Sequence, residues 1–142
     1  NILLLPIFAL VLARLAHLTG DAAYRAGCEQ VIRAFSGGVA RHFPTLATLL
    51  AGYELLEGAR QVAVIGDPTD ADARTLLRAA AMAPVSDLVL APVAPDADLP
   101  AEHPAHGKTP VDAKPAAFVC IGPTCRPPVT EPDALRAALE AG

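Results

Sequence analysis

The stretch Gln61-Val62-Ala63-Val64-Ile65-Gly66-Asp67-Pro68-Thr69 decides the fold class of this chain. Its first five residues are mostly apolar and β-branched, and the Gly-Asp-Pro that follows predicts a strand ending in a turn. Thr69, with Asp72 three residues later, resembles a capping box, so we expect a helix from Asp70 to about Met82. A second apolar run, Asp87 to Val93, comes next. The order strand, helix, strand predicts a parallel pair of strands.

Downstream of this pair the composition changes. From about residue 94 to residue 115 the chain is rich in Pro, Asp, His and Gly and has little periodicity, which is typical of a long surface connection. Ala116 to Ile121 predicts a third strand, and Glu131 to Ala141 a closing helix with Thr130 as its cap. We therefore expect residues 59–142 to form a small three-stranded, mainly parallel α/β unit.

Upstream, residues 1–58 predict a run of packed helices, so the fold class as a whole is mixed α and α/β. Leu, Ala and Val dominate the opening, and Gly20 and Asp21 suit the end of one helix and the cap of the next. Connections this short make successive helices roughly antiparallel neighbours. We expect helices at Ile7 to Leu18, Ala22 to about Phe35, and about Thr45 to Leu56.

Composition argues against several classes of function. The formal net charge is -4 and Lys and Arg are scattered, which argues against nucleic-acid binding. The apolar run from Ile2 to Leu15 starts at Asn1 and meets Arg14 early, so it is too short for a membrane span and lacks the charged start of a signal peptide. Three cysteines are too few for a disulfide framework, and we expect a reducing, cytoplasmic setting.

Several phrases of the sequence, in this order, resemble the end of a known family. They are Leu15-Ala16-His17-Leu18-Thr19-Gly20-Asp21, Gln61-Val62-Ala63-Val64-Ile65-Gly66, Val111-Asp112-Ala113-Lys114-Pro115-Ala116-Ala117-Phe118-Val119-Cys120 and Cys125-Arg126-Pro127-Pro128-Val129-Thr130. Together they resemble the C-terminal part of the thioredoxin-domain-containing family that includes spermatogenesis-associated protein 20 and its bacterial relatives.

The resemblance implies a position within a larger architecture. Members of that family typically carry a thioredoxin-like domain, then an α/α barrel similar to sugar epimerases and six-hairpin glycosidases, then a small α/β tail. Residues 1–58 would be the last barrel helices and residues 59–142 the tail. The chain starts without Met, as a fragment or a processed product would. The expected partners are then the missing barrel helices and the thioredoxin-like domain, or a second copy through the apolar first helix.

Cys120 and Cys125 are the strongest candidates for chemistry. They lie at the end of a strand and across a Gly-Pro turn, where they could form a disulfide, share a metal, or simply brace the turn. C-x4-C is not the C-x-x-C of redox enzymes, which favours a structural role over thiol redox work. His103 and His106 could complete a set of zinc ligands, but structural zinc sites use tighter ligand spacing, and we expect no metal.

Two other patterns have simpler interpretations. The turn from Gly66 to Thr69 occupies the place where doubly wound folds bind phosphate, but its aspartates favour helix capping. Glu54 and Glu57 lie on adjacent turns of the third helix, and such pairs are typical of a solvated face rather than of glycosidase acids.

No serine-hydrolase motif of the G-x-S-x-G type is present, and Ser36 and Ser86 lie in ordinary contexts. His17 is expected to bind carbonyl groups at a helix end. The sequence therefore predicts no cofactor and no complete active site. The leading hypothesis is a structural or interaction role; the alternatives are a share in a carbohydrate-active or sugar-isomerising enzyme, and thiol redox work through Cys120 and Cys125.

Overall fold

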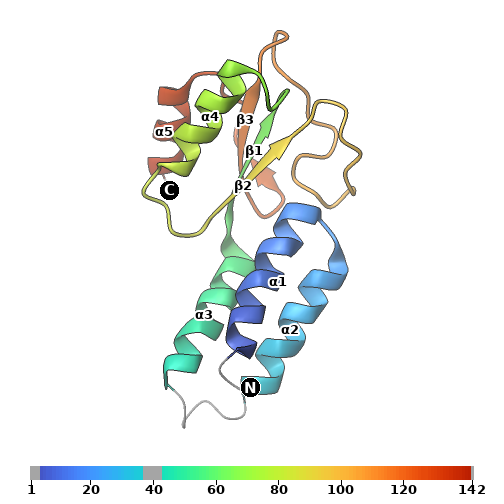
Figure 1. The fold of residues 1–142 in the computed structure, drawn as a ribbon, viewed down its shortest axis with the longest axis vertical. Helices are drawn as coiled ribbons and strands as arrows, with labels where there is room; N and C mark the ends of the chain where they lie inside the picture. The colour runs from blue at the N-terminus through green and yellow to red at the C-terminus, as the bar shows by residue number, and fades with distance from the viewer. Residues whose placement is uncertain (1–3, 37–42, 142) are drawn as a thin grey trace. The chain divides into compact units, whose positions relative to one another are not determined.

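The structure, a computed structural model, describes residues 4–36 and 43–141 (Figure 1). Contacts divide the chain into two compact units, Asn1–Ala59 and Arg60–Gly142. The first is helical, and the second contains a sheet with helices, so the chain has a mixed α/β fold. No helix among the described residues has both the length and the apolar character needed to cross a bilayer.

The helical unit consists of α1 (Leu5–Thr19), α2 (Ala22–Ser36) and α3 (Phe43–Gly58). The predicted hairpin between the first two helices is confirmed. Gly20 adopts the left-handed conformation (φ 70°) that ends α1, and the carboxylate of Asp21 accepts a hydrogen bond from the backbone N–H of Ala23 at 2.8 Å. The chain then reverses, and α2 runs antiparallel to α1 (Figure 1).

Small residues let α1 lie close to its neighbours. Ala9 and Ala13 are fully buried, and Gly52 of α3 packs against Ala9 so closely that a Cβ on Gly52 would lie 3.2 Å from the Cβ of Ala9. From α2, the thiol of Cys28 donates a hydrogen bond to the carbonyl oxygen of Ala9 at 3.2 Å. The inward face of α1 is therefore made of small residues, and its large apolar side chains lie elsewhere on the helix.

The second unit is built on a four-stranded sheet of order β2-β1-β3-β4. Its strands are β1 (Arg60–Ile65), β2 (Leu88–Val93), β3 (Ala116–Ile121) and β4 (Thr124–Cys125). The parallel pairing of β1 with β2 confirms the strand–helix–strand prediction. The prediction of three mainly parallel strands is wrong, because β3 pairs antiparallel with β1, and β4 antiparallel with β3.

The reason is the connection between β2 and β3. A parallel third strand needs a crossover, usually a helix, that carries the chain back to the starting edge of the sheet. Residues 94–115 contain no helix and do not carry the chain back across the sheet. β3 therefore begins beside the carboxyl end of β1 and runs antiparallel to it. A tight turn at Gly122 (φ 55°) and Pro123 then adds β4, since Pro fixes a negative φ after the positive φ of Gly122.

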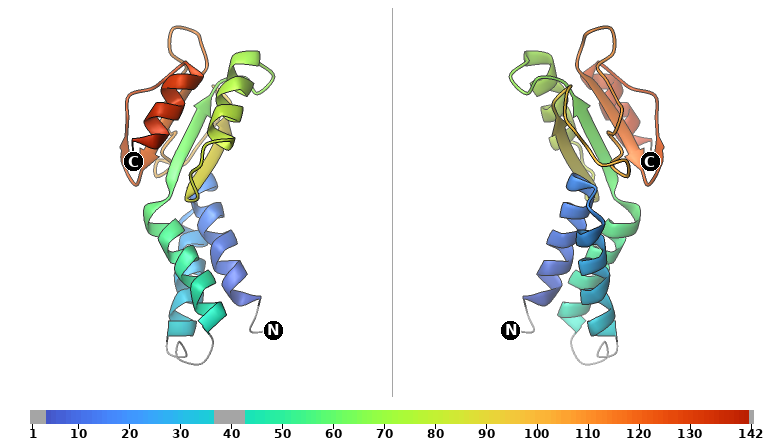
Figure 2. Two further views of the ribbon diagram at one scale, coloured as in Figure 1. Left: turned by 90° about the vertical axis from the view of Figure 1, so that its left-hand side faces the viewer. Right: turned by 90° about the vertical axis from the view of Figure 1, so that its right-hand side faces the viewer.

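Different elements cover the two faces of the sheet. On one face lie α4 (Ala71–Ala81) and α5 (Pro132–Glu140), as the left view of Figure 2 shows. Both helices pack leucines against the strands. The buried core there consists chiefly of Val62, Val64, Leu76, Ala117, Val119, Leu135 and Leu139.

Residues 94–115 cover the opposite face, as the right view of Figure 2 shows. They were predicted to be a surface connection, and this is wrong for part of the segment, because His103 and Ala105 are buried. Ala105 packs with Ile65 and Phe118 of the sheet. Backbone groups in the segment are satisfied locally: the N–H of Ala105 donates to His103 Nδ1 at 3.0 Å. Local hydrogen bonds thus allow a segment without regular structure to bury a sheet face.

Two predicted helix caps need correction. Asp70, not Thr69, caps α4, since its carboxylate accepts a hydrogen bond from the N–H of Asp72 at 2.7 Å. At α5 the N-cap residue is Glu131, without a side-chain cap, rather than Thr130. Pro132 is the first residue of that helix, and its fixed φ favours the start of a helix in place of a capping hydrogen bond.

Candidate functional site

The most conspicuous surface of the helical unit is apolar. On α1 and the residue before it, five large side chains are 39–56% exposed: Leu4, Ile7, Phe8, Val11 and Leu18. Leu4, Ile7, Phe8 and Val11 are spaced by three and four residues, and Leu18 follows Val11 by seven, so all five lie on one side of the helix. The exposed Arg14 lies on the same side, between Val11 and Leu18. We call these five residues the α1 stripe.

The stripe lies opposite the face that α2 and α3 cover. Ala9 and Ala13 mark the covered face, and each lies about 160° around the helix axis from Val11. The first turns of α1 are apolar on both sides, which is typical of a buried helix, yet the described residues cover one side only. The exposed apolar surface is contiguous from Leu4 to Val11, and Arg14 separates it from Leu18. Contiguous exposed apolar surface marks a site of interaction.

α3 has the same two-sided character. Leu55 and Leu56 are buried within the unit, whereas Leu50 and Tyr53 are each 50% exposed. Because apolar side chains point both inward and outward, α3 also resembles a helix from the interior of a larger assembly. Leu50 and Tyr53 add a second apolar patch on the surface of the helical unit.

The polar residues of the unit hold its helices together. Nε2 of His17 lies 2.8 Å from the carbonyl oxygen of Leu55, so the residue expected to bind a helix end does so on α3. Arg25 donates to Glu57 at 2.9 Å and to the carbonyl oxygen of Leu56. Glu54 and Glu57 are exposed, and the pairing of Glu57 with Arg25 fits the predicted solvated face.

Cys120 and Cys125, which the sequence left open between several roles, form a disulfide. They are directly opposite each other on β3 and β4, so the bond braces the hairpin made by the Gly122–Pro123 turn. Cys120 is 1% exposed, beneath residues 94–115, while Cys125 is partly exposed. The bond uses both sulfurs, so neither is a thiolate available to a metal.

The histidines expected as weak zinc candidates make backbone contacts instead. His103 accepts from Ala105, and Nδ1 of His106 lies 2.7 Å from the carbonyl oxygen of Leu99. Within residues 4–36 and 43–141 there is no group of three or more His, Cys, Asp or Glu side chains that could hold a metal ion. His103, His106, Cys120 and Cys125 are therefore not brought together as a site.

The turn after β1 has little free space beside its glycine. A Cβ on Gly66 would lie 2.8 Å from the ring of Pro115, so little space remains beside this glycine. Asp67 accepts hydrogen bonds from the hydroxyl of Thr69 at 2.6 Å and from its N–H at 2.8 Å, and these bonds lower the pKa of Asp67. An ionised carboxylate at this position repels an anion, which favours a role of the turn in helix capping over phosphate binding.

Comparison with known proteins identifies no relative. No protein-family model matches the chain, and no curated protein and no solved structure is significantly similar to it. The resemblance to the thioredoxin-domain-containing family therefore stays a prediction from sequence phrases.

The sequence did not identify which side of α1 is exposed. Its long run of apolar residues was the one signal that part of this helix could lie uncovered.

Proposed function

We propose that this chain has a structural or interaction role, in which the α1 stripe and the Leu50–Tyr53 patch of α3 dock further helices, and that it has no complete active site of its own. The observation that carries the proposal is the half-exposure of five large apolar side chains on one side of α1. Covering the remaining half of five such side chains is worth about 5 kcal/mol at the usual hydrophobic value per side chain. That is enough to hold a helix in place.

The occupant we propose is the set of neighbouring helices of an α/α barrel, as the family resemblance implies. Three helices with short connections, two of them apolar on both sides, support this assignment. In the absence of such helices, a second copy would cover the stripe. The stripe consists of five half-exposed side chains, far fewer than the roughly 20–30 residues that each partner contributes to a standard interface. Self-association is therefore expected to be weak and dependent on concentration.

A share in a sugar-processing enzyme is the less supported alternative. Glycosidase chemistry requires two carboxyl groups that face each other across a substrate. Glu54 and Glu57 instead lie on an exposed helix surface, and Glu57 is engaged by Arg25. Nothing in this arrangement favours the enzyme over the docking role.

Thiol redox work is the second alternative, and the Cys120–Cys125 disulfide is the observation that favours it. Cys125 is partly exposed, so a reductant can reach its sulfur. We retain the cytoplasm as the proposed compartment. A disulfide that persists in the native protein would argue instead for an oxidising compartment, because cytosolic thiols are kept reduced.

Sedimentation velocity over a range of concentrations tests the docking proposal. We expect the unmodified chain to associate weakly, Phe8→Glu to be monomeric, and Met82→Glu to behave like the unmodified chain. Met82 is the matched control because it is 78% exposed and lies in the second unit. A chain that is monomeric at every concentration, or a Phe8→Glu variant that associates as strongly as the unmodified chain, would contradict the proposal.

A further inference from the structure

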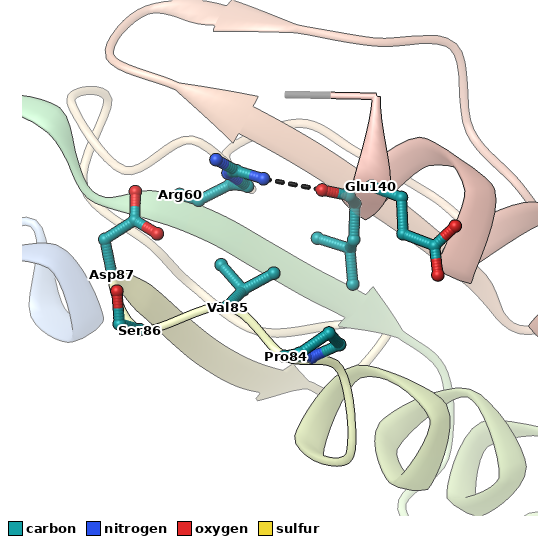
Figure 3. A pocket seen from close by; sticks show the side chains of 7 residues that line it. Arg60, Pro84, Val85, Ser86, Asp87 and Glu140 are labelled. Carbon is teal, nitrogen blue, oxygen red and sulfur yellow. Dashed lines mark hydrogen bonds between the residues drawn. The ribbon is translucent and has the colours of Figure 1, made fainter.

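The docking role of α1 leaves two features of the second unit without a function: a hollow and a buried histidine. The hollow, of about 400 Å³, lies at the starting edge of β1 and β2 (Figure 3). Arg60 donates a hydrogen bond there to the carbonyl oxygen of Leu139, which ties β1 to the end of α5 and gives the hollow a structural role. The histidine, His103, lies in residues 94–115, which we call the cover segment because they cover one face of the sheet.

His103 holds the middle of the cover segment together. The residue is 3% exposed. Its N–H donates to the carbonyl oxygen of Pro100, and its carbonyl oxygen accepts from the N–H of His106, both at 2.9 Å. Its ring nitrogen Nδ1 accepts from the N–H of Ala105 at 3.0 Å. The backbone and the side chain of this one residue therefore fix the conformation of residues 100–106.

The hydrogen bond to Nδ1 requires a neutral His103 ring. A backbone N–H can only donate, so Nδ1 must carry a lone pair and the ring proton must lie on Nε2. A protonated ring carries a hydrogen on both nitrogens, and Nδ1 then has no lone pair to offer to Ala105. Protonation of His103 and this hydrogen bond therefore exclude each other.

His106, in the same segment, is arranged in the opposite way. Its Nδ1 lies 2.7 Å from the carbonyl oxygen of Leu99, which can only accept, so Nδ1 of His106 carries a hydrogen. A protonated His106 keeps this bond. Acidification is thus expected to break the contact made by His103 and to leave the contact made by His106.

The hydrogen bond of His103 is coupled to the packing of the cover segment. Its donor, Ala105, is 2% exposed and packs with Ile65 and Phe118 on the sheet. Loss of the bond would leave the N–H of Ala105 buried without its acceptor, which is costly unless the segment moves away from the sheet. Protonation of His103 is therefore expected to open this part of the segment.

The charged groups that surround the cover segment favour a neutral ring. The core cluster on which the segment packs contributes apolar side chains and the disulfide-bonded Cys120 and Cys125, which do not titrate. Lys108 holds its ammonium group 4.8 Å from the centre of the Phe118 ring, so it brings positive charge to this face. The other charged side chains of the segment are exposed and screened by solvent: Asp96, Asp98, Glu102, Asp112 and Lys114.

Backbone strain at the end of the segment also favours opening. Asp112 and Ala113 adopt positive φ angles of 49° and 61° in the turn between Val111 and Lys114. Alanine rarely adopts this conformation, because its Cβ crowds the backbone and it has no polar side chain to form a local hydrogen bond. The closed cover segment is therefore held against local strain.

We propose that His103 is a pH-sensitive switch, whose protonation below about pH 6.5, where histidine ordinarily titrates, releases residues 100–106 from the sheet. The open form binds the additional proton, so acidification favours opening and neutralisation restores the closed form. Opening exposes the apolar face around Ile65 and Phe118 and leaves the face covered by α4 and α5 intact. The switch belongs to the second unit and does not depend on the docking role of α1.

Amide hydrogen exchange of the ¹⁵N-labelled chain, with its disulfide intact, tests the proposal between about pH 7.5 and about pH 5. The protection factor corrects for the intrinsic effect of pH on exchange. We expect the protection factors of Ala105 and His106 to fall by at least about tenfold, since each pH unit below the titration of histidine favours the open form a further tenfold. Those of Val62 and Val119, in β1 and β3, should change by less than about twofold.

Two matched variants assign the effect to one histidine. His103→Asn keeps a side-chain acceptor for the N–H two residues on but cannot be protonated, so protection of Ala105 should no longer depend on pH. His106→Asn is the control, which keeps a donor for Leu99 and should behave like the unmodified chain. If His103→Asn fails to fold, the ring signals of His103 in the unmodified chain decide, because they should titrate with the same midpoint as the loss of protection. Protection of Ala105 that is constant down to about pH 5, a fall that persists in His103→Asn, or two different midpoints would overturn the proposal.

Discussion

Two glycine-to-alanine substitutions test whether α1 is held by its small-residue face. Gly52 of α3 and Gly27 of α2 both lie inside helices that pack on α1. A Cβ on Gly52 would lie 3.2 Å from the Cβ of Ala9 and 3.3 Å from backbone atoms of Ala9 and Leu10. A Cβ on Gly27 would lie 3.5 Å from the nearest atom, the flexible end of Leu12, which is an ordinary contact.

The two variants should therefore have opposite effects. Alanine inside a helix is favoured over glycine by about 1 kcal/mol, and this gain applies to both positions. At Gly52 the new methyl group meets the backbone of α1, which cannot turn aside, and overpacking of this kind costs about 1–3 kcal/mol. Gly27→Ala should stabilise the helical unit by up to about 1 kcal/mol, while Gly52→Ala should destabilise it by about 1 kcal/mol on the same two values.

Urea unfolding followed by circular dichroism measures both free energies of unfolding. The difference between the two variants is the informative quantity, because the gain in helix propensity cancels. We expect Gly52→Ala to be less stable than Gly27→Ala by about 1–3 kcal/mol. Equal stabilisation by both substitutions would refute the reasoning, since it would mean that α1 and α3 are not in close contact at Ala9.

Three further outcomes follow from the described contacts. Reduction of the Cys120–Cys125 bond should lower the free energy of unfolding by about 2 kcal/mol, from the short loop that it closes, and Cys125→Ser should make the chain insensitive to reductant. Asp67 should titrate below its ordinary pKa of 3.8, because its carboxylate accepts hydrogen bonds from the hydroxyl and the N–H of Thr69. The stabilisation from these bonds is therefore present above pH 3.8 and is lost as the pH falls through the lowered pKa. Thr69→Ala should raise the pKa of Asp67 in an NMR titration. Burial raises the pKa of Cys28 above 9.0 despite Arg25, so alkylation at pH 9 should be slow in the folded chain and fast in urea; equal rates would contradict this.

Much of the local structure could be predicted from the sequence. The β1–α4–β2 order follows from the apolar run at residues 61–65 and the turn after it, and it correctly predicts the parallel pair. The direction of β3 was predicted wrongly, although the absence of a helical pattern in residues 94–115 was a signal that the chain returns without a crossover. The burial of His103 and Ala105 had no such signal, because a covering segment without regular structure has no periodicity.

The candidate sites depended on tertiary distances that the sequence does not contain. The disulfide requires Cys120 and Cys125 to be opposite each other, and that register is set by the turn at Gly122 and Pro123. The hollow at Arg60 depends on packing in the same way, because Arg60 and Leu139 lie at opposite ends of the second unit in sequence and meet only through the packing of α5 on the sheet. For α1, periodicity alone could not decide which side the other helices cover, since both sides are apolar.

The central claim is that the α1 stripe is a docking surface. Amide hydrogen exchange, measured at a low and at a high concentration of the unmodified chain, tests it most directly. We predict that amides around Phe8 and Val11 exchange more slowly at the high concentration, while amides of β1 and β3 exchange at the same rate in both samples. Concentration-independent exchange along α1, in a sample whose β-strand amides are well protected, would contradict the account.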